Sequence, residues 1–334
     1  MEAKRKRLFP AVALSLVLVG ATGYAAAEEI NREFHQTFEV GQGSKLVLEH
    51  GDGDVKITPW GEDTLDVEVR YRARASNIGW TKSTDFEVEF RQEGNTVYVT
   101  GHEPKRINVG ISTYREYEYL YTVKGPSYLK LNLEGEDGDV EIADWNGSIM
   151  MKLEDGDVRL SDIDAPRTEV ILEDGDLEID RIRGEIEVDC EDGDIEIFDC
   201  QSDHGRIRSE DGDITIDRCQ GSFEILVADG DARLSELTAR DLEIRSGDGT
   251  VNLSLLPSED LDLNVRVSDG DVVVDLDKEI SAVFELETQD GRIRVHAADV
   301  NDLVQDRRRV TGRVGGGDGA IYVRTDDGSV TLRQ

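Results

Sequence analysis

The pentapeptide Glu154-Asp155-Gly156-Asp157-Val158 contains a turn that recurs along most of the chain. The same Asp-Gly pair ends at Gly53, Gly138, Gly156, Gly175, Gly193, Gly212, Gly230, Gly249, Gly270, Gly291, Gly319 and Gly328. Between Gly138 and Gly249 the steps alternate between 18 and 19 residues, and the next two steps are 21 residues long. A period near 20 residues is typical of stacked repeats, in which neighbouring units complete each other's core.

Apolar residues alternate with charged residues on both sides of this turn. Seven and five residues before the Gly, a largely apolar column contains Leu131, Leu133, Ile149, Met151, Thr168, Val170, Ile186, Val188, Phe223, Ile225, Leu242, Ile244, Leu263, Val265, Phe284 and Leu286. Two and four residues after the Gly, a second column contains Val140, Ile142, Val158, Leu160, Leu177, Ile179, Ile195, Ile197, Ile214, Ile216, Val251, Leu253, Val272 and Val274. Seven residues after the Gly, a corner position is occupied by Trp60, Trp145, Ile163, Ile182, Cys200, Cys219, Leu237 and Leu256. Because a strand with one buried face alternates with a period of two, each unit is predicted as strand, turn, strand and corner.

Two architectures are compatible with these columns. A two-residue Asp-Gly loop favours a β-hairpin, which would give an antiparallel β meander or sandwich. In a parallel β-solenoid, each coil turns at the Gly, which adopts left-handed backbone angles at little cost, and equivalent residues stack on one another. Like residues recur in like columns, including Cys200 and Cys219, which favours the solenoid. We therefore expect an all-β fold, a parallel β-solenoid (β-helix) of about ten coils and roughly 45–50 Å in length.

The chain is predicted to contain four segments: a signal peptide at residues 1–27, an N-terminal β region with the first coil and a cap at 28–128, regular Asp-Gly-Asp repeats at 129–296, and an irregular loop with C-terminal closing strands at 297–334. Residues 1–27 have a basic start, a short apolar stretch and a small-residue site, so cleavage is expected after Ala27. No later segment approaches 18 continuous apolar residues, and no membrane span is expected after cleavage. These features predict a periplasmic, secreted or cell-surface protein.

The charge of the chain restricts its partners. It contains 73 acidic and 38 basic residues among 334, a net charge of −35. Removal of residues 1–27, which contain four basic residues and one acidic residue, would change this to about −38. Such a polyanion is not expected to bind nucleic acid through phosphate contacts. The expected partners are envelope or surface proteins, cationic peptides or glycans.

Several stretches resemble one known family. They are His50-Gly51-Asp52-Gly53-Asp54-Val55-Lys56-Ile57-Thr58-Pro59-Trp60, the segment from Tyr121 to Pro126, and the Gly-rich ending from Gly315 to Val323 with Asp327-Gly328-Ser329-Val330. Together with the Gly-Asp repeats, they resemble the bacterial putative-adhesin family of β-strand-repeat domains. The resemblance implies a β-solenoid surface or envelope protein, and it brings no catalytic residues. The regular Asp on both sides of the Gly departs from the usual pattern of that family.

The paired Asp residues are the sharpest chemical feature of the sequence. In a parallel stack, the Asp before the Gly (the first Asp) and the Asp after it (the second Asp) form two columns, which include Asp155, Asp157, Asp174, Asp176, Asp192, Asp194, Asp211 and Asp213. Carboxylates about 4.8 Å apart repel by roughly 0.9 kcal/mol per pair even in water. One interpretation is that the first Asp caps amides of its own turn while salt screens the rest. The other is a ladder of Ca²⁺ ions held at the turns, although neither the EF-hand nor the nonapeptide Ca²⁺ pattern is present.

The three cysteines fall at positions that are predicted to be buried. Cys200 and Cys219 occupy the corner column, and Cys190 stands where other coils carry Leu153, Leu172 or Val227. They are expected to be small core residues. An exported chain also permits a disulfide, either Cys200 with Cys219 or Cys190 with Cys200.

Signals for catalysis are weak. The five His residues lack ligand spacing, and no nucleophile or nucleotide-binding motif is found. The aromatic strand from Tyr114 to Val123 could line a carbohydrate-binding or carbohydrate-cleaving site, or it could be packed in the cap. The basic run Arg307-Arg308-Arg309 lies in a segment without repeats, Asp299 to Arg313, and is predicted either to pair with acidic turns at the end of the rod or to form a solvated loop.

The function predicted from the sequence is an exported, non-enzymatic interaction scaffold, similar to an adhesin, that contacts its partners through an acidic face. The alternatives are a carbohydrate-binding or carbohydrate-cleaving β-helix and a Ca²⁺-stabilised structural rod. No cofactor other than Ca²⁺ is expected.

Overall fold

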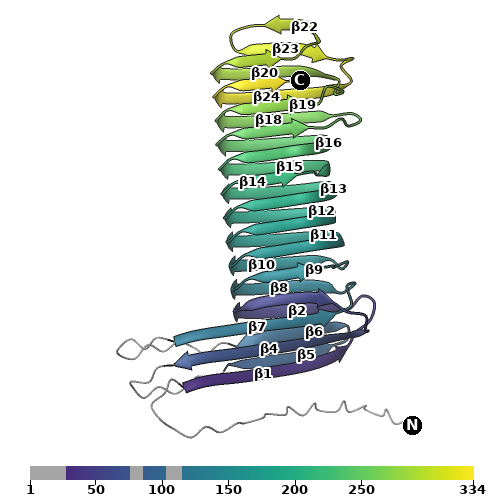
Figure 1. Ribbon diagram of the computed structural model, residues 1–334, viewed down its shortest axis with the longest axis vertical. Helices are drawn as coiled ribbons and strands as arrows, with labels where there is room; N and C mark the ends of the chain where they lie inside the picture. Colours follow the sequence, from purple (N-terminus) through teal and green to yellow (C-terminus); the bar gives the residue numbers. More distant parts are fainter. Residues whose placement is uncertain (1–27, 76–85, 103–114) are drawn as a thin grey trace, which may run out of the picture.

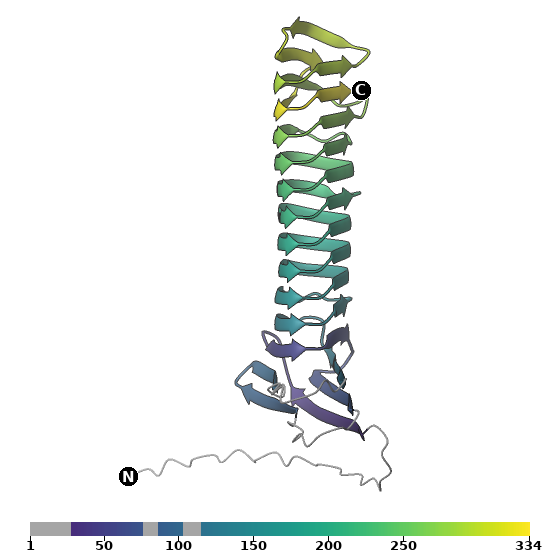
Figure 2. The same cartoon turned by 90° about the vertical axis from the view of Figure 1, so that its left-hand side faces the viewer.

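Twenty-five β-strands stack along one axis in the structure, a computed structural model that describes residues 28–75, 86–102 and 115–334. The strands run across a long rod, and the N-terminal end is widened by additional antiparallel strands (Figures 1 and 2). The predicted signal peptide, its cleavage site and Tyr114 lie outside the described residues. Among the described residues, no helix has the length and apolar character needed to cross a bilayer.

The strands that precede the Asp-Gly turns form one continuous ladder, called the first ladder. Its members in spatial order are β5 (Glu87–Glu93), β6 (Thr96–His102), β2 (Lys45–Asp52), β8 (Lys130–Asp137), β10 (Ile149–Asp155), β11 (Val158–Asp174), β12 (Leu177–Asp192), β13 (Ile195–Asp211), β15 (Gln220–Asp229), β16 (Ala232–Asp248), β18 (Asp262–Asp269), β24 (Gly319–Asp327), β20 (Ala282–Asp290), β23 (Arg309–Val314) and β22 (Val300–Gln305).

The strands that follow the turns form the second ladder, to which β11, β12, β13 and β16 also contribute their first halves. Its other members in spatial order are β1 (Glu28–Glu39), β4 (Thr64–Ala75), β7 (Arg115–Gly125), β3 (Asp54–Pro59), β9 (Val140–Ala143), β14 (Ile214–Asp217), β17 (Val251–Leu255), β19 (Val272–Leu276), β25 (Val330–Arg333) and β21 (Ile293–His296).

Pairing between repeats is parallel and in register. Leu172 pairs with Cys190, and Cys190 pairs with Ser209, so equivalent positions of successive repeats lie side by side. The parallel interpretation is therefore correct for the repeats, and the hairpin alternative is wrong there. The two predicted apolar columns are buried throughout and form the core between the ladders. One corner assignment was wrong: Leu255 pairs with Leu237 and is buried, whereas Leu256 is 36% exposed.

The N-terminal end is closed by a cap of antiparallel strands. β1 pairs with β4, β4 with β7, and β5 with β6, all antiparallel, as the prediction of an N-terminal β cap requires. The ends of the two ladders meet there, because the ring of Phe34 lies 5.6 Å from that of Phe86 and Phe38 lies 6.3 Å from Phe90. Buried aromatic residues thus close the core at this end.

The C-terminal end is built differently from the prediction. β24 lies between β18 and β20, so the last residues of the chain are inserted between two coils that precede them in sequence. Residues 297–334 also contain less loop than expected, since β22 and β23 form an antiparallel hairpin that covers β20. Arg309 pairs with Glu285 and Glu287 of β20, so the basic run contacts a strand and not the acidic turns.

The turn glycines stack closely enough to exclude any side chain. Gly193 has a φ of +141°, and a Cβ at this position would lie 2.2 Å from the carbonyl oxygen of Gly175 in the preceding coil. Both the backbone angle and the contact therefore require glycine.

We expect Gly193→Ala to lower the free energy of unfolding by about 1–3 kcal/mol, because alanine there adds backbone strain and a clash with the neighbouring coil. Urea unfolding followed by circular dichroism measures the change. Gly41→Ala is the matched control, since nothing lies within 4 Å of that position, and its stability should match that of the parent. Equal stability of the two variants would contradict the stacked turn.

Candidate functional site

All eight Asp residues predicted as metal ligands lie along one edge of the rod, where the two ladders meet at the turns. The first Asp residues pair in register at the ends of their strands, as in the pair Asp174 and Asp192. The second Asp residues stand at the beginning of the second ladder, and their side chains are exposed, as are those of the first. The two predicted columns are therefore present.

The second Asp of each turn makes a hydrogen bond that the sequence analysis did not anticipate. Its Oδ1 accepts a bond from the backbone amide of the equivalent residue in the next coil, at 3.0 Å from Asp157 to Asp176 and 2.8 Å from Asp194 to Asp213. The acceptors of this series are Asp54, Asp139, Asp157, Asp176, Asp194, Asp213, Asp231 and Asp271. We call this series the carboxylate–amide ladder.

The other turn amides bond in the opposite direction along the rod. The amide of Gly212 donates to the carbonyl oxygen of Asp229 at 3.1 Å, and that of Ile214 donates to Asp231 at 2.9 Å. The amide between them, that of Asp213, donates to Asp194 of the preceding coil. Three consecutive amides of one turn are therefore bonded to its two neighbours, as buried or closely stacked backbone requires.

Two positions in the chain act as natural controls for this role of Asp. Thr250 and Ser329 replace the second Asp in their turns, and both still donate their amides, to Asp231 and Asp271. Neither offers a carboxylate to the coil that follows. Within the described part of the chain, the amides of the residues that follow them, Asp271 and Arg292, have no carboxylate acceptor of this kind.

These contacts change the interpretation of the paired Asp residues. The expected cap by the first Asp in its own turn is replaced by a cap from the second Asp on the next coil. Within residues 28–75, 86–102 and 115–334, no group of three or more His, Cys, Asp or Glu side chains is arranged to hold a metal ion. Binding of Ca²⁺ by the turn carboxylates stays a prediction.

Replacing Asp194 separates the structural role from a metal role. Asp194→Ala removes the acceptor for the amide of Asp213 and should lower the melting temperature by about 1–3 °C, because one hydrogen bond is lost. Asp194→Asn keeps an acceptor oxygen and removes a like charge from the column, so its melting temperature in EDTA should equal or exceed that of the parent. Differential scanning calorimetry measures both.

The first Asp supplies the control, since Asp192→Ala removes no inter-coil acceptor and should change the melting temperature less than Asp194→Ala. If millimolar Ca²⁺ stabilised the parent by many degrees and Asp194→Asn abolished that gain, the turns would be metal sites instead.

A shallow acidic groove of about 460 Å³ runs beside the turns on the outer face of the second ladder. Its acidic residues are Asp54, Asp139, Glu141, Asp157, Asp176, Glu178, Asp194 and Glu196. Only two basic residues line it, Lys56 and Arg159, and each is paired with a groove carboxylate, Lys56 with Glu141 and Arg159 with Glu178. We call this surface the acidic groove, and its excess of carboxylates makes it attractive to cations.

The first ladder carries a second acidic hollow of about 690 Å³ over β12 to β18. Its charged lining residues are Glu185, Glu187, Glu224, Asp241, Glu243 and Asp262 with Arg167 and Arg206. Both arginines are engaged, since Arg167 pairs with Glu185 and Glu187, and Arg206 pairs with Glu224 at 2.9 Å. Acidic excess is therefore a property of both outer faces.

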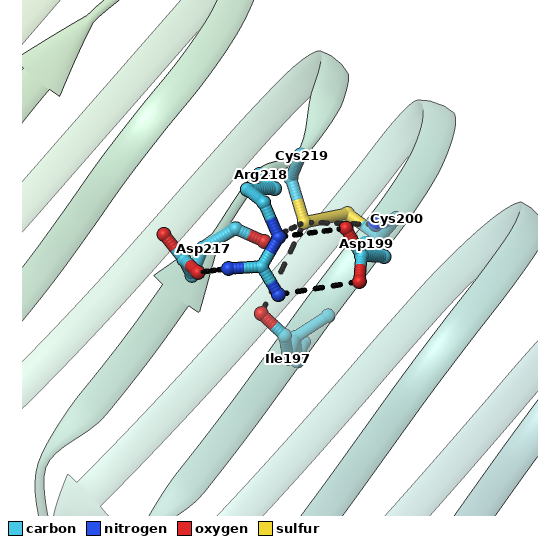
Figure 3. The surroundings of a disulfide bond; sticks show 6 residues. All are labelled: Ile197, Asp199, Cys200, Asp217, Arg218 and Cys219. Atoms are coloured by element: carbon cyan, nitrogen blue, oxygen red, sulfur yellow. Dashed lines mark hydrogen bonds and ion pairs between the residues drawn. A yellow bond between two sulfur atoms is a disulfide. The ribbon is translucent and has the colours of Figure 1, made fainter.

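The corner opposite the turns carries balanced charge. Six residues that are not glycine adopt left-handed backbone angles there, with φ between 50 and 59°: Asp144, Asp162, Arg181, Asp199, Arg218 and Glu236. Arg181 bonds both oxygens of Asp162 at 2.6 and 2.8 Å, and Arg218 bonds Asp199 at 2.9 and 3.2 Å (Figure 3). These arginines lower the pKa of Asp162 and of Asp199. The corner is thus cross-linked between coils by ion pairs, unlike the turns.

The corner also contains a disulfide between Cys200 and Cys219 of successive coils (Figure 3). The expectation that all three cysteines are free core residues is therefore wrong for this pair, and one of the two predicted pairings is present. Cys190 is a buried free thiol, and burial, with the charges of nearby Asp176 and Asp192, raises its pKa to about 11. A thiol with this pKa is unreactive at neutral pH.

The predicted aromatic binding strand is a packing element. Within β7, Tyr119 and Tyr121 are buried, and the ring of Tyr119 lies 4.9 Å from that of Phe86 and 5.1 Å from that of Tyr71. The described tyrosines of this strand therefore form part of the cap core and no exposed sugar platform.

A buried histidine lies where the cap joins the first coils. In the first ladder His50 lies between two glycines, Gly101 and Gly135, and only 5% of its surface is exposed. A Cβ on Gly135 would lie 2.4 Å from the imidazole, so the glycine makes room for the ring. Burial lowers the pKa of His50 from 6.5 to about 4, despite opposing contributions from Gly51 and Asp52.

This histidine predicts a loss of stability in mild acid. Between pH 6.5 and 4 the unfolded imidazole binds a proton and the folded one does not, so its contribution is complete above pH 6.5 and is lost as the pH falls towards 4. Relative to His50→Leu, which lacks the titrating group, the parent should lose up to about 3 kcal/mol across this range. Urea unfolding at several pH values measures the difference, and parallel pH profiles for the two proteins would contradict the prediction.

The fold and the site together define a class: an all-β, parallel-stacked repeat protein with an acidic surface and no assembled catalytic or metal constellation among its described residues. The family model described as Toastrack DUF4097 matches residues 43–225 and 220–333. The chain belongs to this family, which confirms the resemblance to bacterial adhesin-like domains of unknown function. No curated protein matches the chain.

Three solved structures show distant likeness. They are a "putative cell adhesion protein" from Clostridium sporogenes ATCC 15579 (13% identity, 91% of this chain and 100% of that chain, TM-score 0.24), a "putative adhesin" from Bacteroides fragilis NCTC 9343 (10%, 90% and 97%, 0.34), and a "putative lipid binding protein" from Parabacteroides distasonis ATCC 8503 (13%, 90% and 97%, 0.36). These identities and TM-scores are too low to bear on the function of this chain.

Proposed function

We propose that the protein is an exported, non-enzymatic interaction scaffold of the cell envelope or surface, which holds cationic peptides or cationic segments of envelope proteins in its acidic groove. The observation that carries the proposal is the composition of the groove, where eight carboxylates face two basic side chains. Export is supported by the leader-like residues 1–27 of the sequence.

The groove is suited to an extended cationic chain. Its acidic residues recur from coil to coil, because successive strands are in register, as with Glu178 and Glu196. The spacing between neighbouring strands is about 4.8 Å, so carboxylates are presented at regular short intervals along the rod. Attraction of this kind is long-range and weakens as salt increases.

A fluorescent deca-lysine peptide tests the proposal, with binding to residues 28–334 measured by anisotropy at low and at 0.5 M salt. The triple variant Glu141→Gln, Glu178→Gln, Glu196→Gln should weaken binding at least about fivefold at low salt, because the groove loses its outward carboxylates and frees Lys56 and Arg159. Acetylated peptide should not bind.

The triple variant Glu87→Gln, Glu89→Gln, Glu93→Gln in β5 is the control, because it changes the net charge equally at a place remote from the groove. It should weaken binding less than twofold. Equal losses in the two triple variants would mean that net charge alone attracts the peptide and would overturn the assignment to the groove.

A further inference from the structure

The C-terminal tip of the rod has an open sheet edge. β22 is the last strand of the first ladder and pairs with β23 on one side (Figures 1 and 2). In the described part of the chain, no strand pairs with its other side. Open edges are surfaces on which another extended chain can add main-chain hydrogen bonds.

The same edge is the most apolar exposed part of the rod. Leu303 and Val304 are 49% and 67% exposed, and Val304 is the most exposed large hydrophobic residue in the described chain. Val283 of the adjacent β20 is 47% exposed, so three of the five exposed large hydrophobic residues lie at this end. The alignment of β22 with β23 is interrupted between Asn301 and Val304, and all residues from 301 to 309 are exposed.

The charge of the tip differs from that of the rod. Residues 299–313 contain four arginines and three aspartates, whereas the chain as a whole has nearly twice as many acidic as basic residues. Arg309 is paired with Glu285, and Arg313 with Asp302. Arg307 and Arg308 have no ion pair among the described residues. Two rods would repel each other side by side but not at their tips.

The charges around the open edge are complementary to themselves. If Leu303 of one copy lies opposite Val304 of a second copy in antiparallel pairing, Asp299 of one copy lies opposite Arg308 of the other. A two-fold axis repeats both contacts, which is the property of an isologous interface. The result is an apolar centre with an Asp and Arg pair on either side.

We infer that two copies of this chain join end to end through antiparallel pairing of their β22 strands. The contact leaves the acidic groove and the N-terminal cap of each rod free, so it is compatible with the proposed function without depending on it. The edge is short, so the dissociation constant should lie roughly between 10 and 500 µM.

Sedimentation velocity of residues 28–334 from 1 to 500 µM, at 0.15 M salt, should show a reversible monomer–dimer equilibrium. Val304→Lys should weaken it at least about tenfold, because a charge replaces the apolar centre of the edge. Met150→Lys is the control, since Met150 is also 49% exposed but lies on the side of the rod, and it should leave the equilibrium unchanged.

A charge exchange tests the orientation of the two strands. Asp299→Arg and Arg308→Asp should each weaken dimerisation, because each variant places like charges opposite one another. The double variant should regain it, and an equimolar mixture of the two single variants should form a heterodimer more tightly than either variant associates alone.

A parent protein that stays monomeric to 500 µM would overturn the inference, as would single variants whose mixture does not associate. A monomeric parent that binds anionic lipid vesicles through Val304 and Arg308 would assign the tip to a membrane surface instead. Unchanged circular dichroism of the surface variants establishes that they are folded.

Discussion

The structure depends on how a tight turn satisfies its backbone when identical turns are stacked in parallel. The carbonyl oxygens of one turn serve the amides of the preceding coil, as Asp229 serves Gly212. The amide of the second Asp points the other way and finds no carbonyl there. The carboxylate of the preceding coil takes that place, as Asp194 does for Asp213. The repeated Asp is thus a backbone acceptor supplied by a side chain.

This solution determines the electrostatics of the molecule. Every coil that supplies an acceptor at the turn also adds a negative charge to one edge of the rod, and the amide bonds offset part of the repulsion in the column. The corner solves its own charge differently, by alternating Arg and Asp between coils, as Arg181 and Asp162 do. The acidic groove follows from this asymmetry, and so does the expectation that partners are cationic.

Much of the fold followed from local pattern. The period, the two apolar columns and the Asp-Gly turns predicted the strands, their buried faces and the parallel stacking. The ends could not be predicted in this way, because the insertion of β24 between β18 and β20 is a long-range pairing with the same local pattern as sequential stacking. The hairpin of β22 and β23 carries no repeat, and its outward residues such as Val304 interrupt the alternation.

The site was predicted in position but not in chemistry. The columns of Asp were where the sequence indicated, yet the role of the second Asp depends on the distance and direction between coils, which composition does not encode. Thr250 and Ser329 were a usable signal, because they interrupt the column where strands of irregular spacing follow. The disulfide of Cys200 and Cys219 was left open for a similar reason, since shared columns allow contact without requiring a bond.

Hydrogen exchange at the turn amides tests the central claim most directly. In residues 28–334, the amides of Asp176, Asp194 and Asp213 lie in exposed turns, where unbonded amides would exchange within seconds or faster. Nuclear magnetic resonance should find them protected as strongly as the flanking strand amides, and Asp194→Ala should remove the protection of Asp213 alone. Rapid exchange of all three amides in the parent protein would contradict the carboxylate–amide ladder.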